Sequence, residues 1–207
     1  MPSDAAPAAR VCVGLIHVCL ELEEYAAAFL LALGLDCFLR AGELLKLAPR
    51  DVVFPRDGGR GTVTLRETKS SRSSGVAEVL TVQDPMVRLL WRVAMMTRPA
   101  DMSDAVPFWL STRERFAKLF AKVTLLQGMS HLGFRLHSLR RGGATAYFRR
   151  TGDLNRTIER GRWATSRVAR LYIRDGLATE VENRLSPSQW RRLQREGAQV
   201  QRFLASI

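Results

Sequence analysis

The chain of 207 residues has the length of one domain, and its 46% hydrophobic residues suffice for a core, which argues against wholesale disorder. Its 32 lysine and arginine residues outnumber its 20 aspartate and glutamate residues, so the net charge is +12. This charge favours a polyanionic partner, most simply nucleic acid, and carries no information about the fold.

The N-terminal part of the chain predicts a loose tail followed by core helices. Residues 1–10 are rich in alanine and proline and predict the tail, whereas residues 11–34 are mostly apolar and predict one or two helices. A short helix is expected over residues 41–47, because Pro49 would stop it. The apolar runs are too short or too interrupted by charge to cross a bilayer, so we expect an intracellular protein without membrane contact.

The three cysteines are Cys12, Cys19 and Cys37, an odd number without a C-x-x-C pair. We interpret them as buried thiols in a reducing compartment, with no disulfide framework and no zinc site. The histidines have no metal-ligand spacing either, so neither a metal nor another cofactor is expected.

A small sheet is predicted next, followed by helices to the end of the chain. Residues 51–54, 62–68 and 76–82 are rich in valine, leucine and threonine, and turn-forming segments separate them, with Lys69 at or near the second hairpin. The predicted later helices cover residues 84–97, 111–126, 138–150, 154–162, 165–174 and 186–205. The predicted class is α+β, mostly α-helical, with a small three-stranded antiparallel sheet.

The basic charge is concentrated late in the chain. Residues 1–45 hold two basic and six acidic residues, whereas residues 131–175 hold eleven arginines, three acidic residues and no lysine. Arginine pairs bidentately with phosphate, although a run of charge is more often simply a solvated face. The expected contacts with a DNA backbone are Arg72, Arg141, Arg162, Arg167 and Arg170.

The same segment contributes to a set of residues suited to cleaving a phosphodiester without a metal. Such cleavage needs cations on the phosphate oxygens, a positioned oxygen nucleophile and an acid for the leaving oxygen. Arg40 and Arg140 are the candidates for clamping the phosphate. Arg40 stands in an apolar context that is costly without partners, and Glu43 could hold it from the same helical face. His137 precedes Arg140 by three residues, so the start of a helix would place both on one face.

Tyr172 is the candidate nucleophile, because it stands among arginines that would stabilise its phenolate. Trp163, nine residues earlier, offers an indole N–H toward the phosphate, and Lys69 is the candidate general acid. Each residue alone has an ordinary explanation: a surface tyrosine, a core tryptophan or a solvated lysine. Their order and spacing favour a shared site.

This order and spacing, from residue 31 to about residue 173, resemble the catalytic domain of the tyrosine recombinases, the phage-type integrases. Residues 136–145 are similar to the family's box around histidine and arginine, and residues 38–43 to its G-L-R-x-x-E box with an altered start. Trp163 occupies the place where the family carries histidine or tryptophan. By the resemblance, His137 would hydrogen-bond the phosphate and Lys69 would be the family's hairpin lysine.

The resemblance implies cleavage and rejoining of double-stranded DNA through a 3′-phosphotyrosine, without metal or ATP, usually by four protomers on two duplexes. It also implies a catalytic domain over residues 11–185 and a C-terminal helix over residues 186–207, which docks on a neighbouring protomer or packs on its own domain. Only about 30 residues precede the Arg40 box. That is too few for the family's usual N-terminal DNA-clamping domain, so we expect a catalytic-domain fragment or a minimal copy from a mobile element.

Two other functions stay open at the level of sequence. One is relaxation of supercoils by the related chemistry of type IB topoisomerases, and the other is DNA binding by a non-catalytic relic of a mobile element. In all three cases the expected location is intracellular and DNA-associated, in a prokaryotic cytoplasm or a eukaryotic nucleus.

Overall fold

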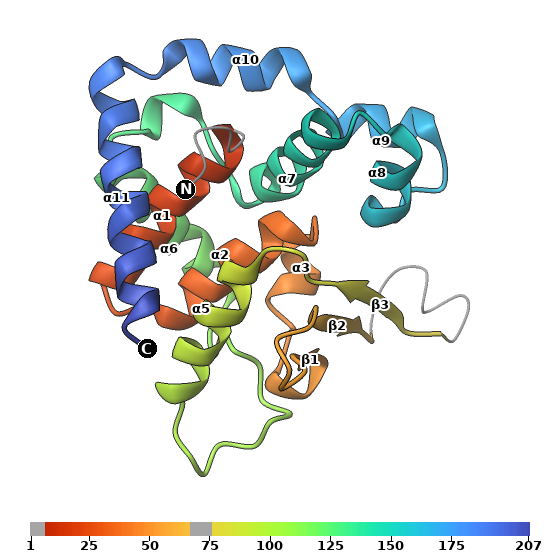
Figure 1. The fold of residues 1–207 in the computed structure, drawn as a ribbon, viewed down its shortest axis with the longest axis vertical. Coiled ribbons are helices and arrows are strands. Elements are labelled where there is room, and N and C mark those ends of the chain that lie inside the picture. The colour runs from red at the N-terminus through yellow and green to blue at the C-terminus, as the bar shows by residue number, and fades with distance from the viewer. Residues whose placement is uncertain (1–6, 67–75) are drawn as a thin grey trace.

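Helices from both ends of the chain pack into one bundle, and the small sheet lies at its side (Figure 1). The computed structural model describes residues 7–66 and 76–207. The helices are α1 (Pro7–Glu21), α2 (Tyr25–Asp36), α3 (Ala41–Leu44), α5 (Pro85–Met96), α6 (Arg113–Leu126), α7 (Leu136–Thr151), α8 (Leu154–Gly161), α9 (Ser166–Tyr172), α10 (Asp175–Arg184) and α11 (Pro187–Ala205). The predicted α+β class with few strands is confirmed.

The centre of the bundle is α2, whose residues from Ala27 to Gly34 are all buried. It packs against α1, α5 and α7. A helix this apolar on every side is stable only when neighbours surround it, which is the position that α2 takes. The helix α1 begins at Pro7, inside the segment that was expected to be a loose tail.

The C-terminal helix α11 packs on α1 of its own domain and buries Leu193, Val200 and Leu204. Gln127, at the end of α6, links the two helices. Its side-chain amide donates to the Gly14 carbonyl at 2.7 Å and to a Glu196 carboxylate oxygen at 2.5 Å. The structure therefore shows packing on its own domain, one of the two placements that the sequence left open for this helix.

The sheet is antiparallel with the order β1-β2-β3, as predicted, and its strands are short. They are β1 (Val52–Val53), β2 (Thr62–Leu65) and β3 (Glu78–Thr81), with Val63 opposite Leu80. Val63 and Leu65 are buried against the bundle, which gives the alternation of a half-buried strand. Lys69 and Arg72 follow β2 in a segment that lies outside the described residues.

The helix α7 approaches the end of α2 so closely that one position requires glycine. A Cβ atom on Gly143 would lie 2.0 Å from the Leu35 carbonyl oxygen. The helix begins at Leu136, two residues before the predicted start. His137 therefore lies in its first turn and Arg140 in its second, both on one face.

The helix α10 was not predicted from the sequence. It runs along the outside of the molecule between α9 and α11, and none of its residues is buried (Figure 1). Arg149 of α7 holds it through ion pairs with Asp175 and Glu182 and through a hydrogen bond to the Thr179 hydroxyl at 2.8 Å. Val181 packs, partly buried, against the cluster of Val11, Leu185 and Leu193, but no residue of the helix is fully buried, so its apolar periodicity is weak.

The three cysteines are free and buried, as predicted. Burial raises the pKa of each thiol, in the case of Cys19 to about 12. None of the helices in residues 7–66 and 76–207 combines the length and the apolar composition needed to cross a lipid bilayer.

Candidate active site

Three of the predicted residues meet around the ring of a fourth, Tyr172, at the end of α9. The Trp163 ring, from the connection between α8 and α9, stacks on it with centroids 4.9 Å apart and an interplanar angle of 27°. The His137 ring centroid lies 5.4 Å from that of Tyr172. The guanidinium carbon of Arg140 lies 5.1 Å from the Tyr172 ring centroid and 5.0 Å from that of Trp163. Residues from α7, from α9 and from the connection between α8 and α9 thus form one cluster.

Arg140 is the most deeply buried of these residues, with 0% of its surface exposed. It donates hydrogen bonds to the carbonyls of Phe38 and, at 2.7 Å, of Gly161. Burial and the nearby charges of Arg40 and Arg162 lower its pKa to about 10, which keeps it charged at neutral pH. Its Nε–H has no hydrogen-bond partner among the described residues, and a phosphate oxygen could accept from a donor of this kind.

Arg40 lies at the start of α3 and is held by Glu43. Its Nη1 lies 2.6 Å from one Glu43 oxygen, and its backbone N–H donates to the other oxygen at 2.8 Å. The Arg40 side chain stays 42% exposed, whereas that of Glu43 is 7% exposed. Burial alone would raise the Glu43 pKa, but hydrogen bonds and charge from Arg162 and Arg40 outweigh it and hold the pKa below its usual range. Glu43 is therefore charged and fixes a partly accessible cation.

Arg162 is not a surface arginine, contrary to what the sequence led us to expect. Its side chain is 9% exposed, and it pairs with Glu43 at 2.9 Å and with Glu78 of β3 at 3.0 Å. Both Nη groups of the Arg162 guanidinium, which was expected to contact a DNA backbone, are therefore paired with carboxylates of the protein.

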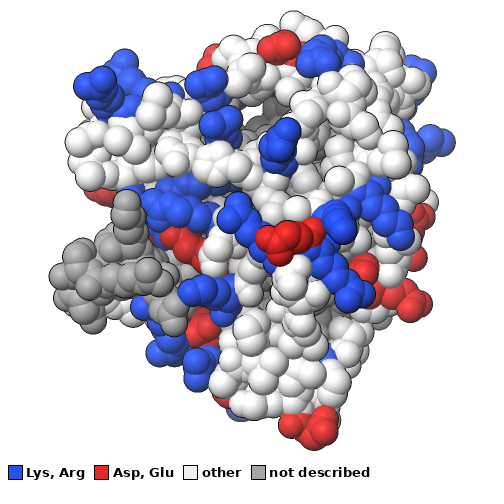
Figure 2. All heavy atoms as spheres, turned by 180° about the vertical axis from the view of Figure 1, so that it is seen from behind, with Lys and Arg blue, Asp and Glu red and all other residues white. Residues whose placement is uncertain are grey.

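The other predicted backbone contacts differ from Arg162 in their exposure. Arg141 lies on α7, and Arg167 and Arg170 lie on α9 beside Tyr172; all three are exposed. Figure 2 shows lysine and arginine side chains gathered across one face of the molecule, with a few acidic side chains between them. Arg72, like the candidate acid Lys69, falls outside the described residues.

His137 is exposed at the start of α7. Its pKa is lowered by partial burial and by the positive charges of Arg141, Arg140 and Arg40. The imidazole is therefore neutral at pH 7, with one nitrogen able to donate and the other able to accept a hydrogen bond.

Several groups that build the site were not predicted from the sequence. Gly161 is required because a Cβ atom there would lie 2.0 Å from the Trp163 ring. The buried Thr145 hydroxyl accepts from the Arg174 N–H at 3.0 Å and lies 3.4 Å from the Tyr172 carbonyl oxygen, which fixes the end of α9. Phe38 stacks on the other side of Trp163 at 6.3 Å. The small and aromatic side chains were visible in the sequence, but their partners were not.

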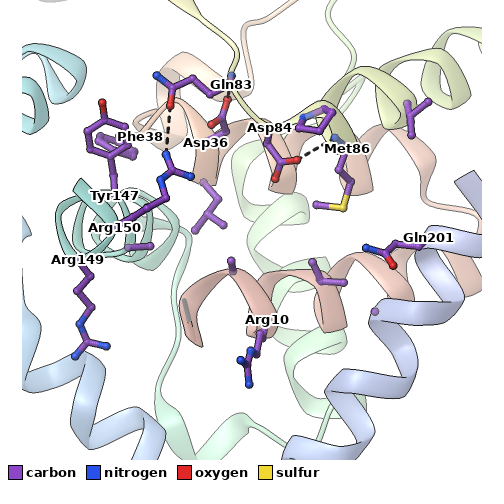
Figure 3. A pocket seen from close by; sticks show the side chains of 18 of the residues that line it. Arg10, Asp36, Phe38, Gln83, Asp84, Met86, Tyr147, Arg149, Arg150 and Gln201 are labelled. Atoms are coloured by element: carbon purple, nitrogen blue, oxygen red, sulfur yellow. Dashed lines mark hydrogen bonds between the residues drawn. The ribbon is translucent and has the colours of Figure 1, made fainter. Parts of the chain in front are cut away.

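A cavity of about 1410 Å³ lies behind this cluster, between α1, α5, α7 and α11 (Figure 3). Phe38 and Tyr147 form part of its wall, and Arg150 donates to the Gln83 side chain at 3.3 Å across one corner. The five described catalytic candidates are not among its lining residues. The cluster around Tyr172, with its convergent charges, is therefore the better candidate for chemistry.

No protein-family model and no curated protein matches the sequence. Solved structures do share the fold. The XerH site-specific recombinase bound to its difH substrate matches in a post-cleavage complex with a TM-score of 0.61 and 14% identity, over 78% of this chain and 47% of that one. A pre-cleavage complex of XerH matches with a TM-score of 0.60 and 15% identity, over 78% and 48% of the two chains. The XerA recombinase matches with a TM-score of 0.61 and 17% identity, over 93% and 63%.

The matches define the class of fold: it is that of a tyrosine-recombinase-like catalytic domain, as the sequence resemblance predicted. The chain spans about half the length of the XerH chains that it matches.

Proposed function

We propose that this chain cleaves and rejoins DNA strands, with Tyr172 as the nucleophile that forms a 3′-phosphotyrosine. The observation that carries the proposal is that His137, Arg140 and Trp163 surround the Tyr172 ring. The centroids of the His137 and Trp163 rings and the guanidinium carbon of Arg140 lie 4.9–5.4 Å from the Tyr172 ring centroid. A hydroxyl nucleophile among buried and half-buried cations matches what a phosphodiester requires.

In the proposed reaction, Arg40 and Arg140 neutralise the non-bridging oxygens of the scissile phosphate. The Tyr172 oxygen attacks phosphorus while neutral His137 accepts or relays the phenol proton. The bond from phosphorus to the 5′ oxygen breaks, and Lys69 gives that oxygen a proton. The 5′ hydroxyl of a partner strand then attacks the phosphotyrosine and restores Tyr172, so the energy of the phosphodiester bond is kept.

Double-stranded DNA is the proposed substrate. The net charge of +12 and the exposed arginines of α7 and α9 suit a phosphate backbone. XerH, which shares the fold, was crystallised on its difH substrate. Exchange of both strands between two duplexes needs four cuts, so we extend the proposal to four protomers on two duplexes. Integration of a mobile element is the form of recombination that we favour.

The test uses EDTA-treated protein, supercoiled plasmid and a pool of nicked duplex oligonucleotides, resolved on a denaturing gel. The wild type is expected to give an SDS-resistant protein–DNA adduct that Tyr172→Phe loses completely. The matched control is Tyr147→Phe. The Tyr147 ring packs against Phe38, and among the described residues its hydroxyl makes no hydrogen bond to the cluster. An adduct that persists in Tyr172→Phe refutes the assignment.

The same reactions separate the two other functions when plasmid topology is read on a native gel and DNA binding by a mobility shift. Relaxed plasmid with an adduct but without recombinant product would indicate a topoisomerase-like enzyme. DNA binding without any adduct, tested also with flanking genomic DNA in the pool, would indicate a non-catalytic relic.

A further inference from the structure

Two buried arginines stand at the end of α8, one on each side of Gly161. Arg160 donates to the carboxylate of Asp36 at 2.8 Å and to the Thr81 carbonyl at 3.2 Å. Arg162 instead pairs with Glu43 and Glu78. The two side chains are buried to nearly the same degree, 10% and 9% exposed, so they differ mainly in their partners.

The backbone at Arg162 is unusual. Its φ is +55°, in the left-handed region that glycine adopts without strain and that is costly for a long side chain such as arginine. A glycine would make the same turn into Trp163 without strain. The arginine side chain must therefore supply something at this position that glycine cannot, and the two carboxylates show what it contacts.

We propose that Arg162 is a positioning residue for the cleavage reaction: its guanidinium bridges Glu43 and Glu78 and, through Glu43, fixes Arg40 relative to Trp163 and Tyr172. Arg162 adjoins Trp163 in the chain and shares the Glu43 carboxylate with Arg40. Arg162 thus connects Arg40, at the start of α3, to the segment that leads to Tyr172. Through Glu78 it also connects β3 to this segment. The inference rests on the proposed function.

The charges explain why the bridge matters to a phosphate. Arg40, Arg140 and Arg162 carry three positive charges, against two negative charges on Glu43 and Glu78. With Arg162 removed, the two carboxylates balance the two arginines that remain. Glu43 would then draw Arg40 fully to itself, and an incoming phosphate would meet no net positive charge from this group.

The decisive variant is Arg162→Gly, because glycine keeps the left-handed backbone and removes only the bridge. At saturating DNA we expect the rate of adduct formation to fall about 100-fold, while the affinity for DNA changes little, since the loss is one of positioning. The melting temperature from circular dichroism reports whether the variant is folded. Arg162→Lys is the second variant; it keeps a cation but not the two-armed fork, and about a tenfold loss is expected.

The pH dependence of the rate of adduct formation supplies a second measurement. If Arg162 were merely structural, its removal would not change this dependence. Arg40, Arg140 and Arg162 are the charged groups that face Glu43. Arg162 lowers the Glu43 pKa, so the Glu43 pKa should rise when Arg162 is removed. The acid limb of the pH–rate profile should then move to higher pH. In the Glu43→Gln background this movement should vanish.

Arg160→Gln is the matched control, because it removes an equally buried arginine from the same helix end. If it lowers the rate as much as Arg162→Gly, and neither variant moves the acid limb, Arg162 is only a structural residue and the inference is overturned. An unaffected Arg162→Gly alongside an active wild type also rejects it. A wild type that forms no adduct refutes the proposed function, and the role of Arg162 in cleavage with it.

Discussion

The Arg140 guanidinium joins three separate segments of the chain before it meets any substrate. It projects from α7, and its hydrogen bonds reach the Phe38 carbonyl after α2 and the Gly161 carbonyl at the end of α8. A buried charge that is satisfied by carbonyl dipoles and faces of aromatic rings is tolerated without a carboxylate partner. The same residue therefore holds together the segments that surround Tyr172.

At this scale the sequence identified side chains but not their partners. Arg140, Trp163 and Tyr172 stood out by type and spacing. Backbone carbonyls exist at every position, so nothing in the sequence marked those of Phe38 and Gly161 as acceptors. The burial of Arg162 was not foreseen for a related reason: an arginine in a basic segment gives no sign that two distant carboxylates will pair with it.

His137 gives a pH-dependent prediction. Partial burial and its arginine neighbours lower its pKa in the free protein. A DNA phosphate would neutralise those arginines, so the pKa should rise when a duplex binds. NMR titration of the imidazole signals, with and without a short duplex, measures both values, and His137→Gln assigns the signal.

The sign of the effect on stability follows from the same shift. Because the folded state binds a proton on His137 less readily than the unfolded state, the free energy of unfolding should fall as the pH drops below the unfolded pKa of about 6.5. The penalty is absent above that pH and should disappear in His137→Gln. A His137 pKa above the ordinary value in the free protein would contradict the geometry described for this site.

At the scale of elements, apolar periodicity located every helix that has a buried face. The helices α5, α6 and α11 lie within two residues of their predicted limits. The helix α10 was missed because its contacts with α7 are made by ion pairs and a hydroxyl rather than by apolar side chains. The pairing of Arg149 with Asp175 depends on how the chain turns after α9, and local sequence does not specify that turn.

The close approach of α7 to α2 gives a prediction about stability. In Gly143→Ala the new Cβ would lie 2.0 Å from the Leu35 carbonyl oxygen and 2.8 Å from the Phe38 ring, so the helices must separate. We expect a loss of about 1–3 kcal/mol in the free energy of unfolding, measured by urea denaturation. The control is Gly176→Ala in α10, where nothing lies within 4 Å of the new atom. That change should stabilise the protein by about 0.5 kcal/mol; equal effects would contradict the packing.

At the scale of the whole molecule, the positive charge has two distinct uses. Some arginines pair with acidic side chains inside the protein, as Arg149, Arg160 and Arg162 do. Others, such as Arg167 and Arg170, are exposed on α9 beside Tyr172. Net charge alone predicted a nucleic-acid partner but not this division, because it depends on burial, which only the fold establishes.

The division gives a prediction about binding to DNA. Each phosphate that a protein neutralises contributes about 0.9 to the slope of log affinity against log salt concentration. Arg167→Ala and Arg170→Ala should each reduce the magnitude of this slope by about one. The slope is measured by fluorescence anisotropy with a duplex between about 50 and 200 mM salt. Arg195→Ala removes the same charge from an exposed position on α11 and should leave the slope unchanged. Equal slopes for all three variants would mean that the α9 arginines do not contact the backbone.

The packing of α11 on α1 has a consequence for how the protein is made. Helix α1 leaves the ribosome well before α11, against which it buries part of its surface, and Gln127 bonds to both Gly14 and Glu196. Translation proceeds at about 5–20 residues per second, so α1 waits roughly 10 to 35 seconds with that surface uncovered. Every catalytic candidate is synthesised before α11. A nascent chain therefore carries Tyr172, the proposed nucleophile, before its domain is complete, and we expect a stable fold around this residue only after α11 has been synthesised.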